Sequence, residues 1–307
     1  APMVFQRIRS SFGIQSDEYL RSVGPEQLLG NMVLGNLSSL SELSSEGKSG
    51  AFFYYTADGQ FMMKTVTHKE QQLLKKMLPR YYDHITQNPG TLIVRFLGLH
   101  CLRVQKDRKG SSNDKLYFVV MGNMFNTPFE IHRRYDLKGS WIGRVTHLDH
   151  RDPAVALKDV DFTTAKEAVH IGEERKAKLL AQIESDSAFL RDQNVIDYSL
   201  LLGIYEIGGS SASVGSAGGV GEALAAASGL AASDAAAPMH RCDMGGMLSS
   251  DKKTLYFLGI IDILTPYDSR KAVEHYFKAL RHNKQGVSCC PPAMYAERFS
   301  KFMQSHM

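Results

Sequence analysis

The spacing of apolar residues over the first 124 residues predicts two hairpins and the helices that accompany them. Residues 4–24 have the pattern of one or two amphipathic helices. Residues 67–82 predict a third helix, which we expect to end around Leu78-Pro79 because proline disrupts a helix interior. Four β-prone runs predict two hairpins of one sheet, 51–56 with 61–66 and 91–104 with 115–123.

Longer apolar runs dominate the second part of the chain. Glu173–Gln193 has helical spacing, and Pro291–Phe302 predicts a closing helix. Residues 147–172 have mixed charge and little periodicity, so we expect a connector there. Three runs predict strands, namely Ile131–Leu137, Val195–Ile204 and Thr254–Leu264.

Residues 206–250 consist largely of Gly, Ala and Ser, with hardly an aromatic residue. Such a segment cannot bury enough apolar surface to offset the entropy lost on ordering. We therefore expect a disordered, low-complexity insertion, with at most a weak helix at 220–232.

The 307 residues suffice for one large or two ordinary domains, and the net charge is only +4. Basic residues nevertheless cluster at about 103–109, 132–144 and 270–284, which favours a polyanionic partner. Nucleotide, nucleic acid and an acidic membrane face are the candidates. Nucleic acid is the least favoured, because aromatic residues are not interleaved with the basic clusters.

The four cysteines have neither paired C-x-x-C spacing nor the density of a disulfide scaffold, so we expect a reducing compartment. The sequence contains no apolar run of about eighteen residues, so we expect any membrane contact to be peripheral. Because the chain opens with Ala1 instead of Met, we also expect it to belong to something longer.

The central motif is the stretch from Arg134 to Arg144, which sets one carboxylate, Asp136, among cationic side chains. Glycines at 139 and 143 let the backbone approach a ligand closely. This chemistry suits a phosphorylated substrate, although an isolated basic turn is more often a solvated surface. The cations are Arg133, Arg134, Lys138 and Arg144.

A glycine-rich stretch at 44–50 precedes the first hairpin and suggests a flap over a nucleotide. A Walker loop is excluded because Glu42 stands where that loop needs glycine and because a strand follows. Lys64, on the second strand, could reach the α- and β-phosphates, oriented by an ion pair with Glu70. The alternative is a snorkelling lysine and a surface glutamate.

Asp197 and Asp262 each interrupt the end of an apolar run. Two strands joined by a long hairpin can bring such acids together, where phosphoryl transfer needs Mg²⁺ and a general base. A satisfied buried carboxylate is the alternative for Asp197. After Asp262, residues 269–281 have an apolar stripe flanked by Arg270, Lys271 and further cations. This pattern is typical of an interfacial amphipathic helix, and also of a helix packed on the core.

Together these motifs resemble the catalytic domain of phosphatidylinositol phosphate kinases, especially the type I, phosphatidylinositol-4-phosphate 5-kinase branch. The stretches 116–140 and 182–204 look closest to plant or algal forms. The resemblance covers the chain apart from 206–250. It rests on Gly47-Lys48-Ser49-Gly50 with Lys64, on Asp136-Leu137-Lys138-Gly139-Ser140, on Asp197-Tyr198-Ser199-Leu200-Leu201 and on Gly259-Ile260-Ile261-Asp262.

The resemblance implies an α+β, two-lobed kinase-like fold with antiparallel sheets and flanking helices. It implies a single domain over 1–307, with an N-lobe of about 1–124 and a C-lobe of about 125–307. It also implies ATP and Mg²⁺ as cofactors, and phosphatidylinositol 4-phosphate in anionic membranes as substrate. The enzyme would be cytoplasmic and peripheral at the inner face of the plasma membrane.

Site residues are implied in the same way. Asp197 matches the catalytic aspartate and Asp262 the Mg²⁺-binding one, while Asp136 and Lys138 match the substrate-side motif. Glu274 matches a position where type I enzymes carry Glu, which favours the 4-phosphate lipid. The implied ATP-binding residues are Gly47, Ser49, Gly50, Lys64 and Glu70. The implied substrate-binding residues are Lys138, Arg144, Arg134, Glu274, Arg270 and Lys271.

The sequence departs from the family pattern at Ala51 (many members have Ser), Ile196 (usually Met) and Arg270-Lys271 (usually Lys-Lys). Two other functions stay open. A soluble inositol phosphate kinase would not need the amphipathic helix, and a catalytically weak phosphoinositide-binding module would not need Lys64, Asp197 and Asp262.

Overall fold

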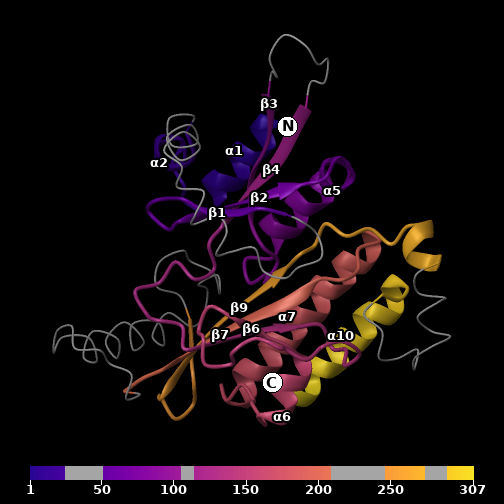
Figure 1. The fold of residues 1–307 in the computed structure, drawn as a ribbon. Helices are drawn as coiled ribbons and strands as arrows, with labels where there is room; N and C mark the ends of the chain where they lie inside the picture. The colour runs from indigo at the N-terminus through magenta and orange to yellow at the C-terminus, as the bar shows by residue number, and fades with distance from the viewer. Residues whose placement is uncertain (25–50, 105–113, 209–245, 274–288) are drawn as a thin grey trace. The chain divides into compact units, whose positions relative to one another are not determined.

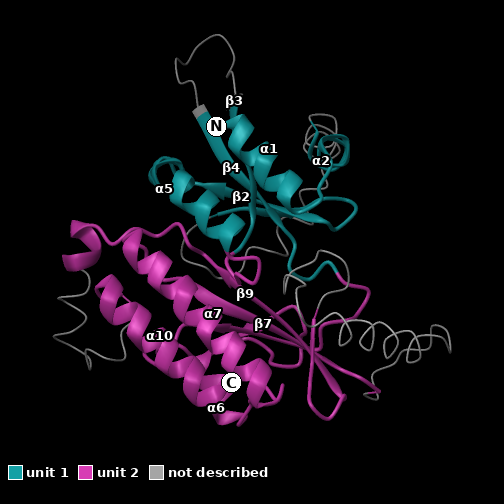
Figure 2. Cartoon of the chain, turned by 180° about the vertical axis from the view of Figure 1, so that it is seen from behind, with its two compact units in different colours: residues 1–87, 94–126 teal, residues 88–93, 127–307 magenta. Residues whose placement is uncertain are grey.

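The protein is described by a computed structural model that covers residues 1–24, 51–104, 114–208, 246–273 and 289–307. Two compact units make up the chain (Figure 2). Unit 1 comprises residues 1–87 and 94–126, and unit 2 comprises residues 88–93 and 127–307. The expected α+β architecture, with two sheets and flanking helices, is confirmed.

Unit 1 is built on a four-stranded antiparallel sheet of order β1-β2-β4-β3 (Figure 1). Both predicted hairpins and both N-terminal helices are confirmed. Its strands are β1 (Phe53–Tyr55), β2 (Phe61–Val66), β3 (Phe96–Val104) and β4 (Asp114–Gly122), and its helices are α1 (Pro2–Ser11), α2 (Ser16–Val23) and α5 (His68–Gln87).

The prediction that α5 ends near Pro79 is wrong, because the helix continues through this proline to Gln87. Proline in a helix interior costs about 3 kcal/mol. Beyond it, however, Tyr81 and Ile85 are buried on the same face as Leu74, and the Tyr81 hydroxyl donates to the Val94 carbonyl at 2.7 Å. Burial of these side chains offsets the cost of the proline.

Unit 2 is built on a five-stranded sheet of order β6-β5-β7-β9-β8, in which the β5–β6 pair is parallel and the other pairs are antiparallel. The predicted strands and the two long helices are confirmed. The strands are β5 (Arg133–Leu137), β6 (Ala156–Leu157), β7 (Ser199–Glu206), β8 (Met247–Leu248) and β9 (Thr254–Ile261), and the helices described over their full length are α6 (Asp159–Thr164), α7 (Glu173–Asp192) and α10 (Pro292–His306). Helices α7 and α10 lie side by side (Figures 1 and 2).

Three expectations for this unit need correction. The connector at 147–172 contains β6 and α6, because buried residues such as Leu157 and Phe162 anchor it to the core. The expected insertion at 206–250 is ordered at its far end, where β8 pairs with β9. Residues 209–245, with the weak helix expected at 220–232, lie outside the described residues.

The third correction concerns the predicted strand 91–104, which begins only at Phe96. Residues 91–93 belong to unit 2, where the buried carboxylate of Asp186 on α7 accepts hydrogen bonds from the Thr91 hydroxyl and the Leu92 amide, both at 2.7 Å. These bonds hold the segment away from the β3 ladder.

Within the described ranges, none of the helices has the length and apolar character that crossing a membrane requires.

Candidate active site

Strand β5 presents the central motif with its alternate side chains on opposite faces of the sheet. Tyr135 and Leu137 are buried in the core, so Arg134, Asp136 and Lys138 share the other face. Asp136 lies opposite Leu201 of β7 in the ladder. The strand therefore delivers a carboxylate flanked by two cations to one surface.

Asp136 is fixed by two neighbours. Its Oδ1 is 2.5 Å from Nη2 of Arg144, and its Oδ2 accepts a hydrogen bond of 2.8 Å from the Ser199 hydroxyl. Burial alone would raise the pKa of Asp136, but the charges of Lys138 and Arg144 and these hydrogen bonds hold it below its usual range. Asp136 is therefore ionised at neutral pH.

Lys138 links this strand to the predicted catalytic aspartate. Its Nζ lies 3.2 Å from Oδ1 of Asp197 and donates to the Asp197 carbonyl oxygen at 2.8 Å. Burial would lower the pKa of Lys138, but the carboxylates of Asp197, Asp136 and Asp262, in decreasing order of effect, raise it above the ordinary value. An ammonium group that is protonated at neutral pH thus stands among three carboxylates.

The two predicted acids leave the sheet at the same end. Ser199, the first residue of β7, pairs with Ile261, the last residue of β9, so Asp197 precedes one strand and Asp262 follows its neighbour. The two loops are also joined, because the Ile196 amide donates to the Thr265 carbonyl at 3.0 Å. The prediction that neighbouring strands bring these acids to one end is confirmed by the register.

Both acids adopt left-handed backbone conformations, with φ of 68° at Asp197 and 60° at Asp262. A non-glycine residue pays about 1–2 kcal/mol for such a φ value. Strain of this kind persists only where the surrounding contacts fix the backbone, and residues that carry it concentrate at functional sites.

Asp159 is a site residue that sequence reasoning missed. Its side chain is buried, and its Oδ1 accepts hydrogen bonds from the amides of Lys138 (2.8 Å), Gly139 (2.7 Å) and Ser140 (3.4 Å). Its Oδ2 accepts a bond of 2.7 Å from Nε of Arg144. This one carboxylate on α6 shapes the turn that presents Lys138 and also orients Arg144.

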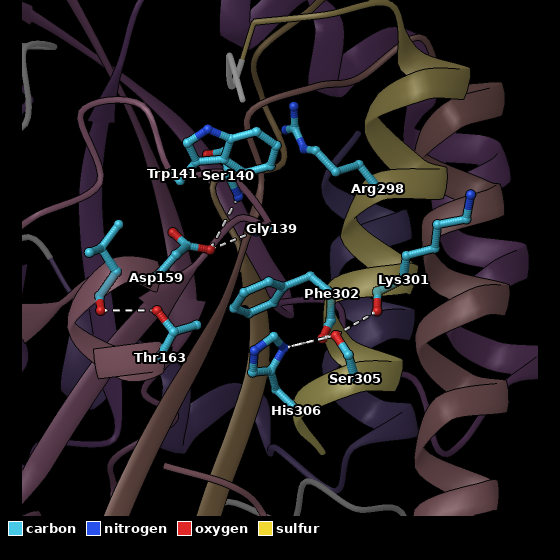
Figure 3. A pocket seen from close by; sticks show the side chains of 11 residues that line it. Gly139, Ser140, Trp141, Asp159, Thr163, Arg298, Lys301, Phe302, Ser305 and His306 are labelled. Carbon is cyan, nitrogen blue, oxygen red and sulfur yellow. Dashed lines mark hydrogen bonds between the residues drawn. The ribbon is translucent and has the colours of Figure 1, made fainter. Parts of the chain in front are cut away.

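The turn packs closely on the C-terminal helix. Gly139 has a φ of 67°, and a Cβ added there would lie 3.1 Å from the Arg298 carbonyl oxygen and 3.1 Å from the Phe302 Cβ of α10. Beside this contact, a pocket of about 360 Å³ is lined by residues of the turn, α6 and α10, with Trp141 facing Arg298 and with Phe302 and His306 across from Asp159 (Figure 3).

The predicted nucleotide residues belong to unit 1. Lys64 lies on β2, half-buried, with its Nζ 5.2 Å from the ring centroid of Phe53. Glu70 lies in the first turn of α5, where its Oε2 accepts hydrogen bonds from the Thr67 amide (2.7 Å) and hydroxyl (2.8 Å). The pairing of Glu70 with Lys64 stays a prediction.

The other predicted residues are placed only in part. Arg134 is half-buried on β5, and the guanidinium of Arg144 is held by Asp136 and Asp159. A helix begins at Ser269, as predicted, where Asp268 Oδ1 accepts from the Lys271 amide at 3.1 Å and Arg270 is exposed. Gly47, Ser49, Gly50, Glu274 and the rest of the helix predicted at 269–281 lie outside the described residues.

Asp197 and Asp262 lie where β7 begins and β9 ends, and they are the carboxylates to consider for a metal ion at this site. Among the described residues, no group of three or more His, Cys, Asp or Glu side chains is arranged to hold a metal ion. Mg²⁺ is usually bound through one or two carboxylates, with water and substrate phosphates completing its coordination. Asp262, whose charge acts on Lys138 together with that of Asp197, fits this mode of binding.

Comparison with known proteins agrees with the motifs. The family model described as Phosphatidylinositol-4-phosphate 5-Kinase matches residues 34–306. A phosphatidylinositol 4-phosphate 5-kinase of Plasmodium falciparum is 44% identical over 310 residues, covering 100% of this chain and 18% of that protein. Phosphatidylinositol 4-phosphate 5-kinase type-1 beta of Rattus norvegicus is 34% identical over 331 residues, covering 100% of this chain and 57% of that protein.

Phosphatidylinositol 4-phosphate 5-kinase 6 of Arabidopsis thaliana is 33% identical over 334 residues, covering 98% of this chain and 44% of that protein. The chain thus spans less than two thirds of the length of these relatives. A kinase family implies the use of ATP. The chain belongs to the phosphatidylinositol-4-phosphate 5-kinase family.

Proposed function

We propose that the chain is the catalytic part of a lipid kinase that transfers the γ-phosphoryl group of ATP to the 5-hydroxyl of phosphatidylinositol 4-phosphate, giving phosphatidylinositol 4,5-bisphosphate. The observation that carries this proposal is the environment of Lys138. Its ammonium group is paired with Asp197, and the charges of Asp136 and Asp262 also favour its protonated form. The relatives are named as kinases for this lipid.

Asp197 is the proposed general base. As the inositol 5-oxygen bonds to the γ-phosphorus, the bond from that phosphorus to the bridging oxygen of ADP breaks, and Asp197 accepts the hydroxyl proton. Lys138, kept protonated by the surrounding carboxylates, supplies positive charge beside the transferred group. Asp136 holds Arg144 in place and adds to the charge that keeps Lys138 protonated.

Asp262 is the proposed ligand for Mg²⁺. The bound ion would neutralise charge on the nucleotide phosphates. On the nucleotide side, Lys64 would contact the α- and β-phosphates, with Glu70 orienting it and Gly47, Ser49 and Gly50 covering the phosphates.

The substrate side is proposed to use cations for the lipid headgroup. Lys138, Arg134 and Arg144 belong to the motif, while Arg270 and Lys271 open a helix beyond Asp262 and Glu274 selects the 4-phosphate isomer. Because the lipid tails stay in the bilayer, this surface would dock onto anionic membranes, and cations near such a surface contribute about 1 kcal/mol each. Such docking would place the enzyme peripherally at the cytoplasmic face of the plasma membrane.

The test is phosphorylation of vesicles that contain phosphatidylinositol 4-phosphate, with labelled ATP and Mg²⁺. We expect Lys138→Ala and Asp262→Asn to abolish labelling at the 5-position. Matched controls are Lys178→Ala and Asp192→Asn, because both side chains are exposed on α7, where Lys178 pairs with Glu174 and Asp192 pairs with Arg191. Undiminished turnover in Lys138→Ala or Asp262→Asn would refute the assignment.

The same assay separates the alternatives. Equal turnover on the water-soluble headgroup and on vesicles would identify a soluble inositol phosphate kinase. ATP binding without transfer would identify a binding module. Separation of the labelled headgroup isomers formed from mixed monophosphorylated lipids tests the choice of the 4-phosphate substrate.

A further inference from the structure

Tyr295, on the first turn of α10, contacts the residue that follows the proposed catalytic base. Its hydroxyl donates a hydrogen bond to the main-chain carbonyl of Tyr198, and both side chains are fully buried. The rings of Tyr295 and Tyr198 meet edge to face with centroids 4.6 Å apart, and Phe299 of the same helix meets Tyr198 at 5.0 Å. The C-terminal helix therefore holds Tyr198 by both its main chain and its ring.

The backbone at Asp197 needs such support because its φ of 68° is strained. Three hydrogen bonds, each with a different partner residue, hold this loop. The Ile196 amide is bound to the Thr265 carbonyl, the Asp197 carbonyl accepts from Lys138, and the Tyr198 carbonyl accepts from Tyr295. Tyr295 holds the peptide unit between Tyr198 and Ser199, one residue beyond Asp197.

Helix α10 contacts the Lys138 turn as well. A Cβ added at Gly139 would lie 3.1–3.2 Å from the backbone of Arg298 and Phe299 and from the Cβ of Phe302, closer than an ordinary van der Waals contact. Figure 3 shows this helix beside the 139–141 turn. One helix thus touches the segments that carry Lys138 and Asp197, so the placement of α10 affects the distance between the ammonium group and the carboxylate.

We propose that Tyr295 is a positioning residue, which holds Asp197 in the conformation required to accept the substrate proton. This role rests on the proposed function, because it takes Asp197 as the general base. Tyr295 itself stays outside the chemistry, since its hydroxyl is used on the Tyr198 carbonyl. A displacement of about 1 Å at a catalytic group can reduce turnover up to about 100-fold, so one buried hydrogen bond suffices for a measurable effect.

The test is Tyr295→Phe, which keeps the ring and deletes only the hydroxyl. We expect kcat on vesicles to fall about tenfold, the equivalent of one net hydrogen bond. KM for ATP should stay unchanged, because the nucleotide residues belong to the other unit. Assays are run well below the midpoint of thermal unfolding, so that all variants are folded.

The matched control is Tyr81→Phe. The Tyr81 hydroxyl is also buried and also donates to a main-chain carbonyl, that of Val94 in unit 1. Both variants should lower Tm, but only Tyr295→Phe should reduce kcat tenfold. A kcat of Tyr295→Phe within twofold of the wild type, or an equal loss in both variants, would overturn the proposal.

Amide hydrogen exchange tests the same idea without catalysis. Tyr295→Phe should accelerate exchange at residues 196–200 at least fivefold, and Tyr81→Phe should leave it unchanged. If the wild type transfers no phosphate to any phosphoinositide, the proposed function fails, and the exchange experiment alone then decides whether Tyr295 holds the Asp197 loop. Unchanged exchange at 196–200 would overturn the positioning role.

Discussion

The two units differ in the kinds of side chain that they bury. In the described part of the chain, the buried carboxylates, Asp159 and Asp186, both belong to unit 2. The described part of unit 1 buries no carboxylate, and its core consists of aliphatic and aromatic side chains such as Leu74 and Tyr81. The centroids of Tyr19 and Phe61 are 5.7 Å apart, and the guanidinium of Arg95 lies 3.9 Å from the ring centroid of Phe12.

This difference separates two ways of stabilising a unit. Packing of apolar side chains depends on shape and is little affected by pH, whereas a buried carboxylate fixes polar atoms in defined directions and is costly to disturb. Unit 2 uses its acids to shape the segments at 91–93 and 138–140. We therefore expect changes of charge to lower the stability of unit 2 most, and the loss of buried side-chain volume to lower the stability of unit 1 most.

The largest effect is expected for Asp159→Asn. An amide cannot replace a carboxylate that accepts from three backbone amides and Arg144, and breaking a buried charge pair costs about 3–5 kcal/mol. Urea denaturation should show this loss of unfolding free energy, together with a large fall in kinase turnover. Asp192→Asn, at an exposed carboxylate, is the control. A loss below about 1 kcal/mol in Asp159→Asn would contradict our account of unit 2.

Leu74→Ala is the corresponding change in unit 1. Leu74 is fully buried on α5, so the cavity should cost about 3 kcal/mol. The loss should be the same at low and high salt, because no charge is involved. Leu20→Ala, at an exposed position of α2, should cost less than about 0.5 kcal/mol. A strong salt dependence of the Leu74→Ala effect would break the comparison.

Gly139→Ala and Gly143→Ala form a matched pair within the motif. Both glycines have positive φ, so each substitution should cost about 1 kcal/mol of backbone strain. At Gly139 the new methyl group would press on α10, whereas at Gly143 no atom of the described residues, apart from the chain neighbours, lies within 4 Å of the added Cβ. We expect thermal unfolding to show about 2 kcal/mol lost at Gly139 and about half of that at Gly143. Equal losses would show that the α10 contact gives way easily.

The smallest expected effect is the loss of stability at acid pH when Asp136 becomes protonated. Because the folded-state pKa of Asp136 is lowered, its ionised form stabilises unit 2 at pH values above the unfolded pKa of about 3.9. This contribution is lost as pH falls through the folded pKa. Urea denaturation between about pH 3 and pH 7 should show the wild type losing its advantage over Asp136→Asn only below about pH 4. An advantage that is unchanged at the acid end would exclude Asp136 as the cause.

Much of the site could be predicted because its acids stand beside apolar runs. An apolar run with a single acid at one end predicts a strand and also singles out that acid as a candidate site residue. Antiparallel pairing then brings Asp197 and Asp262 to one end of the sheet. Asp159 gave no such signal. It lies in the charged stretch Lys158–Asp161, and its partners are mostly backbone amides, which look alike at every position of a sequence.

Other features depended on tertiary contacts that no local pattern contains. The proline in α5 is tolerated because residues beyond it are buried, and the start of β3 is delayed because Asp186 binds Thr91 and Leu92. The strand β8 has only two residues, too few for any periodicity, and it exists because β9 offers a free edge to pair with. The start of β3 depends on the most distant partner, because Asp186 lies 95 positions beyond Thr91.

The register of β7 and β9 also bears on what a change in the connection between these two strands can affect. Ser199 pairs with Ile261 at the end that carries Asp197 and Asp262, whereas Glu206 pairs with Thr254 at the other end. At about 3.3 Å per residue, eight residues separate the two ends by about 25 Å. The connection from residue 209 to residue 245 joins the sheet at the end away from the acids. We therefore expect a change in its length to leave the pairing of Ser199 with Ile261, and so the placement of Asp197 and Asp262, unaltered.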